Sequence, residues 1–404
     1  WQRGFGERFG RIPLAKTEAL RGAKVLWLHA VSVGEVNVCL QLITALRPRL
    51  AGWKFLVSTT TSTGMGELEK KLPVDAQRIY YPVDFPSSVQ HALVSVHPNA
   101  VVLVEAEFWP NFLWQLQDKG LPVFLANARV SQKSFRGYRR AGFIFRELFS
   151  GLAAVGAQNE ADAGRLRELG CRAASIHVTG NAKFDAAAPT GGPELDVAAL
   201  LRQLSVPSDA QLLVAGSTHA GEEVLLARMC LRLRVRFPRL FLVLVPRHFE
   251  RTRAVVEELR PSGLRLALRT DLTEGKAFAP DSADCLLVNT TGELRHFYRH
   301  ATVVFVGKSL TAKGGQNPIE PAALGKAMVF GPHMENFRPI AADFVSSDGA
   351  VQVADAAGLE SALAMLLADG ARREQLGANA LRVVQRNQGA SGRTAEMIAA
   401  RLLA

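Results

Sequence analysis

Short runs of apolar and β-branched residues alternate with longer amphipathic segments along nearly the whole chain. In the first half these apolar runs cover residues 25–31, 55–60, 100–104, 122–126 and 152–157. In the second half they cover residues 211–216, 240–245, 284–289, 302–307 and 327–330. Runs that are apolar on both faces and separated by helix-length segments are typical of parallel strands covered by helices. The pattern therefore predicts an α/β protein.

The alternation is interrupted once, at residues 185–196. This stretch reads DAAAPTGGPELD and is rich in Pro and Gly, with no apolar period. A chain of 404 residues is long enough for two domains. We therefore expect two doubly wound, Rossmann-like domains facing a cleft, residues 1–187 and 188–404. We expect the last helix to pack back on the first domain, and ligands to bind at the carboxyl ends of the strands.

The charge of the chain is unevenly distributed. Lys and Arg number 48 against 37 Asp and Glu, a net charge of +11. Residues 1–190 hold 23 basic and 15 acidic residues, and the remainder holds 25 and 22. A basic first half indicates an anionic partner, such as nucleic acid, a membrane surface or a phosphorylated substrate. Residues 133–140 (KSFRGYRR), followed by Phe143, Phe145 and Phe149, are a candidate contact. The sequence lacks an RNA-binding signature, which argues against nucleic acid.

The cysteines and histidines give no sign of a metal site. The four cysteines, at 39, 171, 230 and 285, are widely spaced, which excludes a zinc ribbon or disulfide framework and indicates a reducing compartment. His296 and His300 are four residues apart but lack an HExxH motif, so we expect no zinc. The sequence contains no run of 18 consecutive apolar residues, so it predicts no membrane-spanning helix. Because the sequence begins at Trp1, we expect a segment bearing a signal or anchor to precede it.

The first candidate for chemistry is the segment VLWLHAVSVGEVNV at residues 25–38. A buried strand ends near Val31, Ser32 can cap the following helix, and Glu35 then lies in the first helical turn. The carboxyl end of a parallel strand is where such sheets bind ligands, which favours a catalytic role. A glutamate in this position is equally favoured by helix capping and by the helix dipole. The residues alone leave both interpretations open.

The second candidate is the segment VVLVEAEFWPN at residues 101–111. Glu105 and Glu107 follow an apolar strand, and Phe108 and Trp109 offer an aromatic floor. If the strand continues, both carboxylates point to the same face, whereas a turn separates them. Capping of the strand end is the alternative role for these acids.

Four polar loops follow apolar runs in the second half: GSTHAGEE at 216–223, VPRH at 245–248, NTTGEL at 289–294 and KGGQNPIEP at 313–321. Ser217 lies at a turn that opens a helix, where anions bind, and Arg247 offers a planar fork for phosphate. Asn317 and Glu320 have the spacing of a capping box. None of the loops is a P-loop or a GxGxxG motif. Together, at successive strand ends, they predict a nucleotide pocket.

Seven stretches occur in one order across residues 29–333: HAVSVGEV, VEAEFWPN, VTGNAKFD, GSTHAGEE, VPRH, TGEL and GGQNPIEPAALGKAMVFGPH. Together they resemble the lipid A 3-deoxy-D-manno-octulosonic acid (Kdo) transferase family, in which RGFGERFG resembles the stretch after an N-terminal membrane anchor. The resemblance implies an inverting GT-B glycosyltransferase that needs no metal or cofactor. It implies transfer of Kdo from CMP-Kdo to a lipid A precursor (lipid IVA) in lipopolysaccharide biosynthesis, at the cytoplasmic face of the inner membrane.

The resemblance also implies roles for individual residues. Glu35 matches the general base, Glu105 a second essential carboxylate and Lys183 a basic residue near the reacting centre. The residues expected to bind CMP are Ser217, Pro246, Arg247, Thr291, Gly292, Glu293, Asn317, Pro318, Ile319 and Glu320. The chain departs from the family pattern at Asn289, Lys308 and Gln316, where the family often has Asp, Gly and His, and these positions bear on fine donor contacts.

Two other functions remain open at this point. One is a different GT-B glycosyltransferase that uses a UDP-sugar, because the fold alone does not fix the nucleotide. The other is a non-catalytic protein that binds anions at a membrane surface, for which phospholipid binding would not depend on Glu35.

Overall fold

The computed structural model describes residues 4–105, 108–187, 195–273 and 277–403. The chain forms two compact units. Unit 1 comprises Trp1–Ala186 and Asn387–Ala404, and unit 2 comprises Ala187–Arg386. The polypeptide therefore passes between the units twice, first within the Pro- and Gly-rich stretch and again after Arg386.

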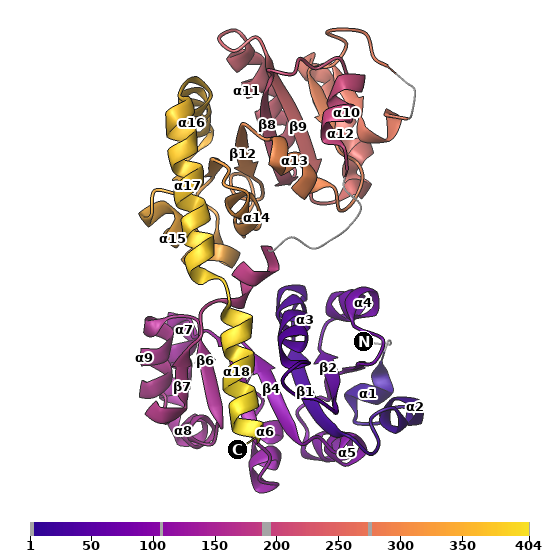
Figure 1. Cartoon of the computed structure of the whole chain (residues 1–404), viewed down its shortest axis with the longest axis vertical. Helices are drawn as coiled ribbons and strands as arrows, with labels where there is room; N and C mark the ends of the chain where they lie inside the picture. The colour runs from indigo at the N-terminus through magenta and orange to yellow at the C-terminus, as the bar shows by residue number, and fades with distance from the viewer. Residues whose placement is uncertain (1–3, 106–107, 188–194, 274–276, 404) are drawn as a thin grey trace. The chain divides into compact units, whose positions relative to one another are not determined.

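Unit 1 contains a seven-stranded parallel sheet in the order β3-β2-β1-β4-β5-β6-β7 (Figure 1). The strands are β1 Lys24–Ala30, β2 Trp53–Thr59, β3 Gln77–Tyr80, β4 Ala100–Val104, β5 Val123–Ala128, β6 Ala154–Ala157 and β7 Ile176–Val178. The strand order reverses between β1 and β4. The loops that follow these two strands lead away to opposite sides, and this topological switch point is where open α/β sheets bind ligands.

Helices cover both faces of this sheet. The helices of unit 1 are α1 Phe5–Arg8, α2 Leu14–Glu18, α3 Val33–Leu46, α4 Ser62–Lys71, α5 Pro86–Val96, α6 Pro110–Asp118, α7 Gln132–Arg140, α8 Gly142–Ser150, α9 Glu160–Glu168 and α18 Ala390–Leu403. One face packs against α5, α6, α8 and α9, and the other against α3, α4 and α18. The last helix, α18, lies beside α3 because Ala390 and Ala395 let the two helices approach closely (Figure 1).

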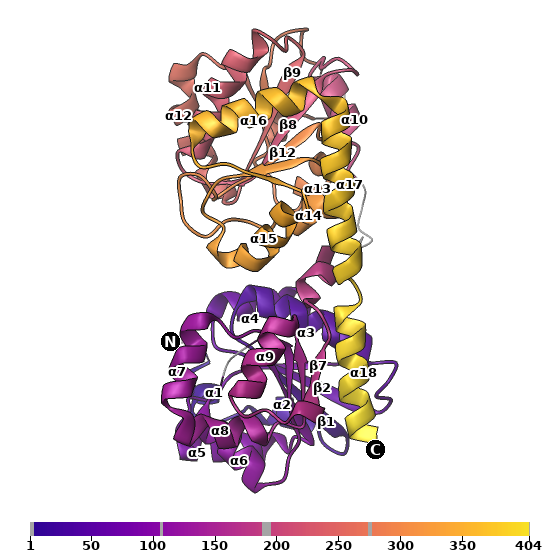
Figure 2. The same ribbon diagram turned by 90° about the vertical axis from the view of Figure 1, so that its left-hand side faces the viewer.

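Unit 2 repeats this architecture. Its parallel sheet has seven strands in the order β10-β11-β9-β8-β12-β13-β14, with the switch point between β8 and β12. The strands are β8 Gln211–Thr218, β9 Leu240–Pro246, β10 Leu266–Leu268, β11 Cys285–Leu287, β12 Val303–Val306, β13 Met328–Phe330 and β14 Val351–Gln352. Its helices are α10 Val197–Gln203, α11 Glu222–Arg234, α12 Thr252–Leu259, α13 Leu294–His300, α14 Ile319–Ala323, α15 Arg338–Ser346, α16 Ala356–Ala368 and α17 Gly370–Asn387. Leucines of α11 and α16 cover one face of the sheet (Figure 2).

The structure confirms the predicted class of doubly wound α/β sheets. Every apolar run predicted from the sequence overlaps a strand. The pattern missed β3, β7, β10 and β14, which are the outermost strands of the two sheets. The four cysteines are free and buried. Across the described parts of the chain, no helix is both long and apolar enough to span a bilayer.

Candidate functional site

Glu35 lies just beyond β1, in the first turn of α3. The Ser32 hydroxyl caps this helix by accepting the Glu35 N–H at 3.3 Å. The hydroxyl donates to Glu35 Oε1 at 2.8 Å, and the Val31 N–H donates to Oε2, also at 2.8 Å. The residue is only 9% exposed. The structure thus confirms the capping interpretation. The same contacts hold the carboxylate in one orientation at the switch point of the sheet.

Glu105 directly follows β4, the neighbour of β1 across the switch point. Its φ of 65° is left-handed, a conformation that costs about 1 kcal/mol or more for a residue with a side chain and is concentrated at functional sites. Its carboxylate Oε1 forms an ion pair with Lys183 Nζ at 2.7 Å. The strand therefore ends in a turn rather than continuing. Glu107 lies outside the described residues.

Lys183 belongs to a short 3-10 segment, Ala182–Ala187, that is fixed at both ends. At its start, the Ala182 N–H donates to Asn127 Oδ1 at 3.0 Å. Two residues after Lys183, the Asp185 carboxylate accepts two backbone N–H groups at the start of α18, at 2.7 and 2.6 Å. These contacts, all within unit 1, place the Lys183 ammonium against Glu105.

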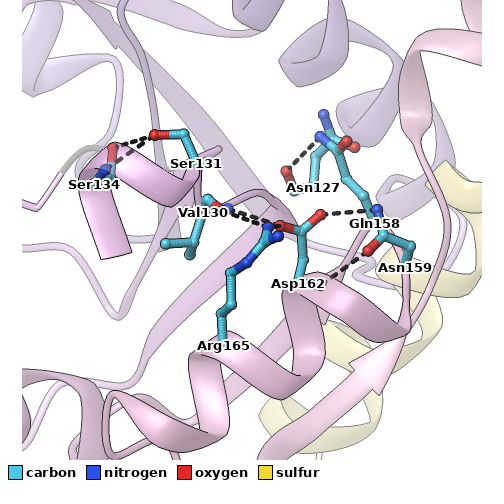
Figure 3. A network of polar contacts seen from close by, with 8 residues as sticks. All are labelled: Asn127, Val130, Ser131, Ser134, Gln158, Asn159, Asp162 and Arg165. Carbon is cyan, nitrogen blue, oxygen red and sulfur yellow. Dashed lines mark hydrogen bonds and ion pairs between the residues drawn. The ribbon is translucent and has the colours of Figure 1, made fainter. Parts of the chain in front are cut away.

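Asn127 is a site residue that the sequence analysis missed. It is 1% exposed, has a left-handed φ of 52°, and its carbonyl accepts Gln158 Nε2 at 3.1 Å. Beyond it, the Val130 N–H donates to Asp162 Oδ1, while Arg165 donates to the Val130 carbonyl (Figure 3). This network from α9 fixes the loop that follows β5, next to the strand residue Asn127 that holds the Lys183 segment. A signal was present, because Asn127 is a polar residue within an otherwise apolar strand.

In unit 2, the loops at the switch point are held together by Glu222. Ser217, near the end of β8, and Lys308, after β12, both have a left-handed φ of 54°. Glu222 is 0% exposed, and its two carboxylate oxygens accept the backbone N–H groups of His219, Lys308, Ser309 and Leu310. A single buried carboxylate therefore ties both loops together. The sequence analysis did not single out Glu222.

Arg247 directly follows Pro246, another residue predicted to bind CMP, at the end of β9. Pro246 is buried and Arg247 is exposed, and the Arg247 N–H donates to the Thr218 carbonyl at 3.0 Å. The loop after β9 is thereby joined to the end of β8, next to Ser217. The guanidinium is near enough to Glu320 to lower the pKa of that carboxyl group, so the structure brings these two predicted residues together.

Asn317 and Glu320 form the predicted pair at the start of α14. Asn317 Oδ1 accepts the Ile319 N–H at 3.0 Å, and Asn317 Nδ2 donates to Glu320 Oε1 at 3.1 Å. The helix begins at Ile319, one residue later than predicted, because Pro318 occupies the cap position. Burial raises the pKa of Glu320, against the opposing effects of Asn317, Arg295 and Arg247.

The predicted loop at residues 289–294 leads into α13. Thr291 and Gly292 are exposed, and Gly292 has a φ of 84°. Glu293 forms a two-pronged ion pair with Arg269, at 2.9 and 3.1 Å, so its carboxylate is already engaged. Arg269 is a further residue that the sequence analysis missed.

No three His, Cys, Asp or Glu side chains among the described residues are grouped so that they could hold a metal ion. His296 and His300 lie on α13, and burial lowers the pKa of His300.

Replacing Glu320 by Gln should stabilise the protein at neutral pH. Burial raises the pKa of Glu320, so its protonated form is favoured in the folded state. This contribution to stability is present at low pH and is lost as pH rises through the folded-state pKa. We expect Glu320→Gln to raise Tm at pH 7, with a gain that shrinks as pH falls toward 4.5. Thermal unfolding across this range tests it. A Tm gain independent of pH would contradict the titration of Glu320.

Two doubly wound parallel sheets, with polar side chains held at each switch point, give the chain the GT-B fold. Its fold is similar to a glycosyltransferase from Rickettsia africae ESF-5, with a TM-score of 0.58 and 14% identity over 95% of this chain and 99% of that one. It is also similar to a putative UDP-N-acetylglucosamine 2-epimerase from Listeria monocytogenes, with a TM-score of 0.60 and 14% identity over 93% and 94% of the two chains.

The sequence comparisons define the family. A family model described as 3-Deoxy-D-manno-octulosonic-acid transferase (kdotransferase) matches residues 3–186. The 3-deoxy-D-manno-octulosonic acid transferase of Bordetella pertussis is 33% identical over 407 residues, which cover 98% of this chain and 92% of that protein. The chain belongs to the 3-deoxy-D-manno-octulosonic acid transferase family.

Proposed function

We propose that this enzyme transfers Kdo from CMP-Kdo to a lipid A precursor in lipopolysaccharide biosynthesis, with inversion at the anomeric carbon. The observation that carries the proposal is the position of Glu35. Its carboxylate is held by two donated hydrogen bonds at the switch point of the first sheet. Glu105 follows the adjacent strand, β4, and forms an ion pair with Lys183. The similarity to the 3-deoxy-D-manno-octulosonic acid transferase of Bordetella pertussis supports Kdo as the transferred sugar.

In the proposed reaction, Glu35 is the general base. It accepts the proton of an acceptor hydroxyl as the hydroxyl oxygen attacks the anomeric carbon of Kdo, and the bond from that carbon to CMP breaks. CMP is a good leaving group, so no protonating acid is required. The Arg247 guanidinium stabilises its phosphate. Lys183, oriented by Glu105, supplies a countercharge for the Kdo carboxylate. The reaction needs neither a metal nor a cofactor.

Nucleotide competition tests the donor. The fold of this chain is shared with a UDP-N-acetylglucosamine 2-epimerase, so a UDP-sugar is the second candidate donor. We expect CMP to bind, as measured by calorimetric titration, and to inhibit transfer. UDP and ADP should bind and inhibit much more weakly. Tighter binding of UDP would favour the UDP-sugar alternative. A non-catalytic membrane-surface protein would release no CMP from CMP-Kdo in the presence of acceptor.

We propose further that the enzyme works at the cytoplasmic face of the inner membrane. The surface of α7 and α8 exposes Lys133, Arg136, Arg139, Arg140 and Phe143, and Phe143 is 86% exposed. A basic helix next to an exposed aromatic ring suits the anionic lipid surface, and each cation contributes about 1 kcal/mol there. These four cations account for part of the excess of basic residues in the first half of the chain.

Replacing Arg136, Arg139 and Arg140 by Gln should weaken binding to phosphatidylglycerol vesicles by about two orders of magnitude at low salt. Vesicle co-sedimentation measures the effect. The matched control is the Gln replacement of three exposed arginines of unit 2, Arg236, Arg253 and Arg260, which should change binding little. Equal losses in both triple variants would contradict a specific role for α7.

A further inference from the structure

Unit 1 contains a cavity of about 690 Å³ that none of the site residues above lines. Its walls come from Arg8 at the end of α1, from residues 60–63 at the start of α4, from residues 80–84 at and after the end of β3, and from Trp109 before α6. Its size lies within the usual range of small-molecule sites. It therefore has room for part of a substrate.

One side of the cavity is cationic. Helix α4 begins at Ser62, after the N-cap Thr61, and its first backbone N–H groups have no partner within the helix. Ser62 and Thr63 are exposed and line the cavity at this positive end of the helix. The Arg8 guanidinium adds a full charge, and donates to the Thr60 carbonyl at 2.8 Å. The acidic lining residue Asp84 accepts backbone N–H groups at the start of α6.

The other side of the cavity is aromatic. The Tyr81 ring stacks on His29 at a centroid distance of 3.8 Å, and Trp109 lies 5.9 Å from Tyr81. Burial lowers the pKa of His29 to about 3, so this stack is uncharged at neutral pH. Tyr80 is 3% exposed, lies 4.3 Å from the Arg8 guanidinium, and its hydroxyl has no hydrogen-bond partner among the described residues. A rigid aromatic wall beside a cationic end suits a sugar ring that carries a phosphate.

One residue, Val31, connects the cavity to the proposed base by hydrogen bonds. The Thr61 hydroxyl at its rim donates to the Val31 carbonyl at 2.8 Å, and the Val31 N–H donates to Glu35 Oε2 at 2.8 Å. We propose that the cavity binds a phosphorylated sugar ring of the acceptor, a position separate from the hydroxyl that reacts. This assignment rests on the proposed function. It makes the phosphate an anchor that presents the acceptor to Glu35.

The substitution Thr63→Asp tests the assignment. A carboxylate in the first turn of a helix is favourable, so the variant should fold as well as the wild type. The same carboxylate repels a bound phosphate, so KM for a phosphorylated lipid A precursor should rise about tenfold. KM for CMP-Kdo and kcat at saturating acceptor should not change. With a dephosphorylated acceptor, the wild type should show the raised KM and Thr63→Asp should add nothing.

Ser87→Asp is the matched control, because Ser87 is exposed in the first turn of α5 and lies outside the cavity. It should leave both KM values unchanged. An unchanged acceptor KM in Thr63→Asp, or an equal rise with both acceptors, would overturn the phosphate assignment. If the wild type transfers no Kdo to either acceptor, the proposed function itself fails, and this assignment with it.

Discussion

Glu35→Gln should lower kcat for Kdo transfer by about 10²–10⁴-fold, the usual contribution of a positioned general base. Gln keeps the size of Glu but cannot accept a proton from the acceptor hydroxyl. It also keeps only one accepting oxygen for the two groups that donate to Glu35, the Val31 N–H and the Ser32 hydroxyl. KM for CMP-Kdo should change little, because Glu35 belongs to unit 1, whereas the residues proposed to bind CMP belong to unit 2. Initial rates with CMP-Kdo and acceptor measure both constants.

A loss of stability must be separated from a loss of chemistry in this variant. Ser131→Ala removes the N-cap of α7 in the same unit, at a cost of about 1 kcal/mol, without touching the proposed site. Its kcat should match the wild type under conditions where both variants are folded. Wild-type turnover by Glu35→Gln would remove Glu35 as the base and leave it a capping residue.

Lys183→Met should lower kcat/KM for CMP-Kdo by about 10²–10³-fold. The variant loses the countercharge proposed for the donor carboxylate and leaves Glu105 without its ion-pair partner at 2.7 Å. Lys183→Arg retains the charge and should recover part of the activity. The double variant Glu105→Gln/Lys183→Met should lose less than the product of the two single effects, because both substitutions break the same contact.

Lys71→Met is the matched control for this prediction. Lys71 pairs with Glu67 at 2.5 Å on the exposed face of α4, and such pairs contribute little. We expect its kcat/KM to equal that of the wild type. If Lys183→Met also had a kcat/KM equal to that of the wild type, the ion pair between Glu105 and Lys183 would only shape the loop after β4.

The hydrophobic pattern predicted the inner strands and missed the outer ones for a physical reason. Inner strands of a parallel sheet are buried on both faces, so each reads as an uninterrupted apolar run. The four missed strands, β3, β7, β10 and β14, each have one neighbour. In β7, for example, two of the three residues are exposed. Such short, half-polar segments do not differ from loops in sequence.

The candidate site was predictable where its chemistry follows a strand directly. Glu35 and Glu105 were found in this way, because a carboxylate after an apolar run marks the carboxyl edge of the sheet. Lys183 was singled out only by the family resemblance. Its position depends on Asn127 and on an Asp185 contact to residues more than 200 positions away. Glu222 likewise acts on a loop 86–88 positions further along, which no local pattern reveals.

Mass spectrometry of the lipid product, after incubation with CMP-Kdo and a tetraacyl lipid A precursor, tests the proposed function most directly. We predict a product heavier than the acceptor by one or more Kdo residues, formed together with free CMP and abolished in Glu35→Gln. An acceptor of unchanged mass, or a product formed only from a UDP-sugar, would contradict the assignment.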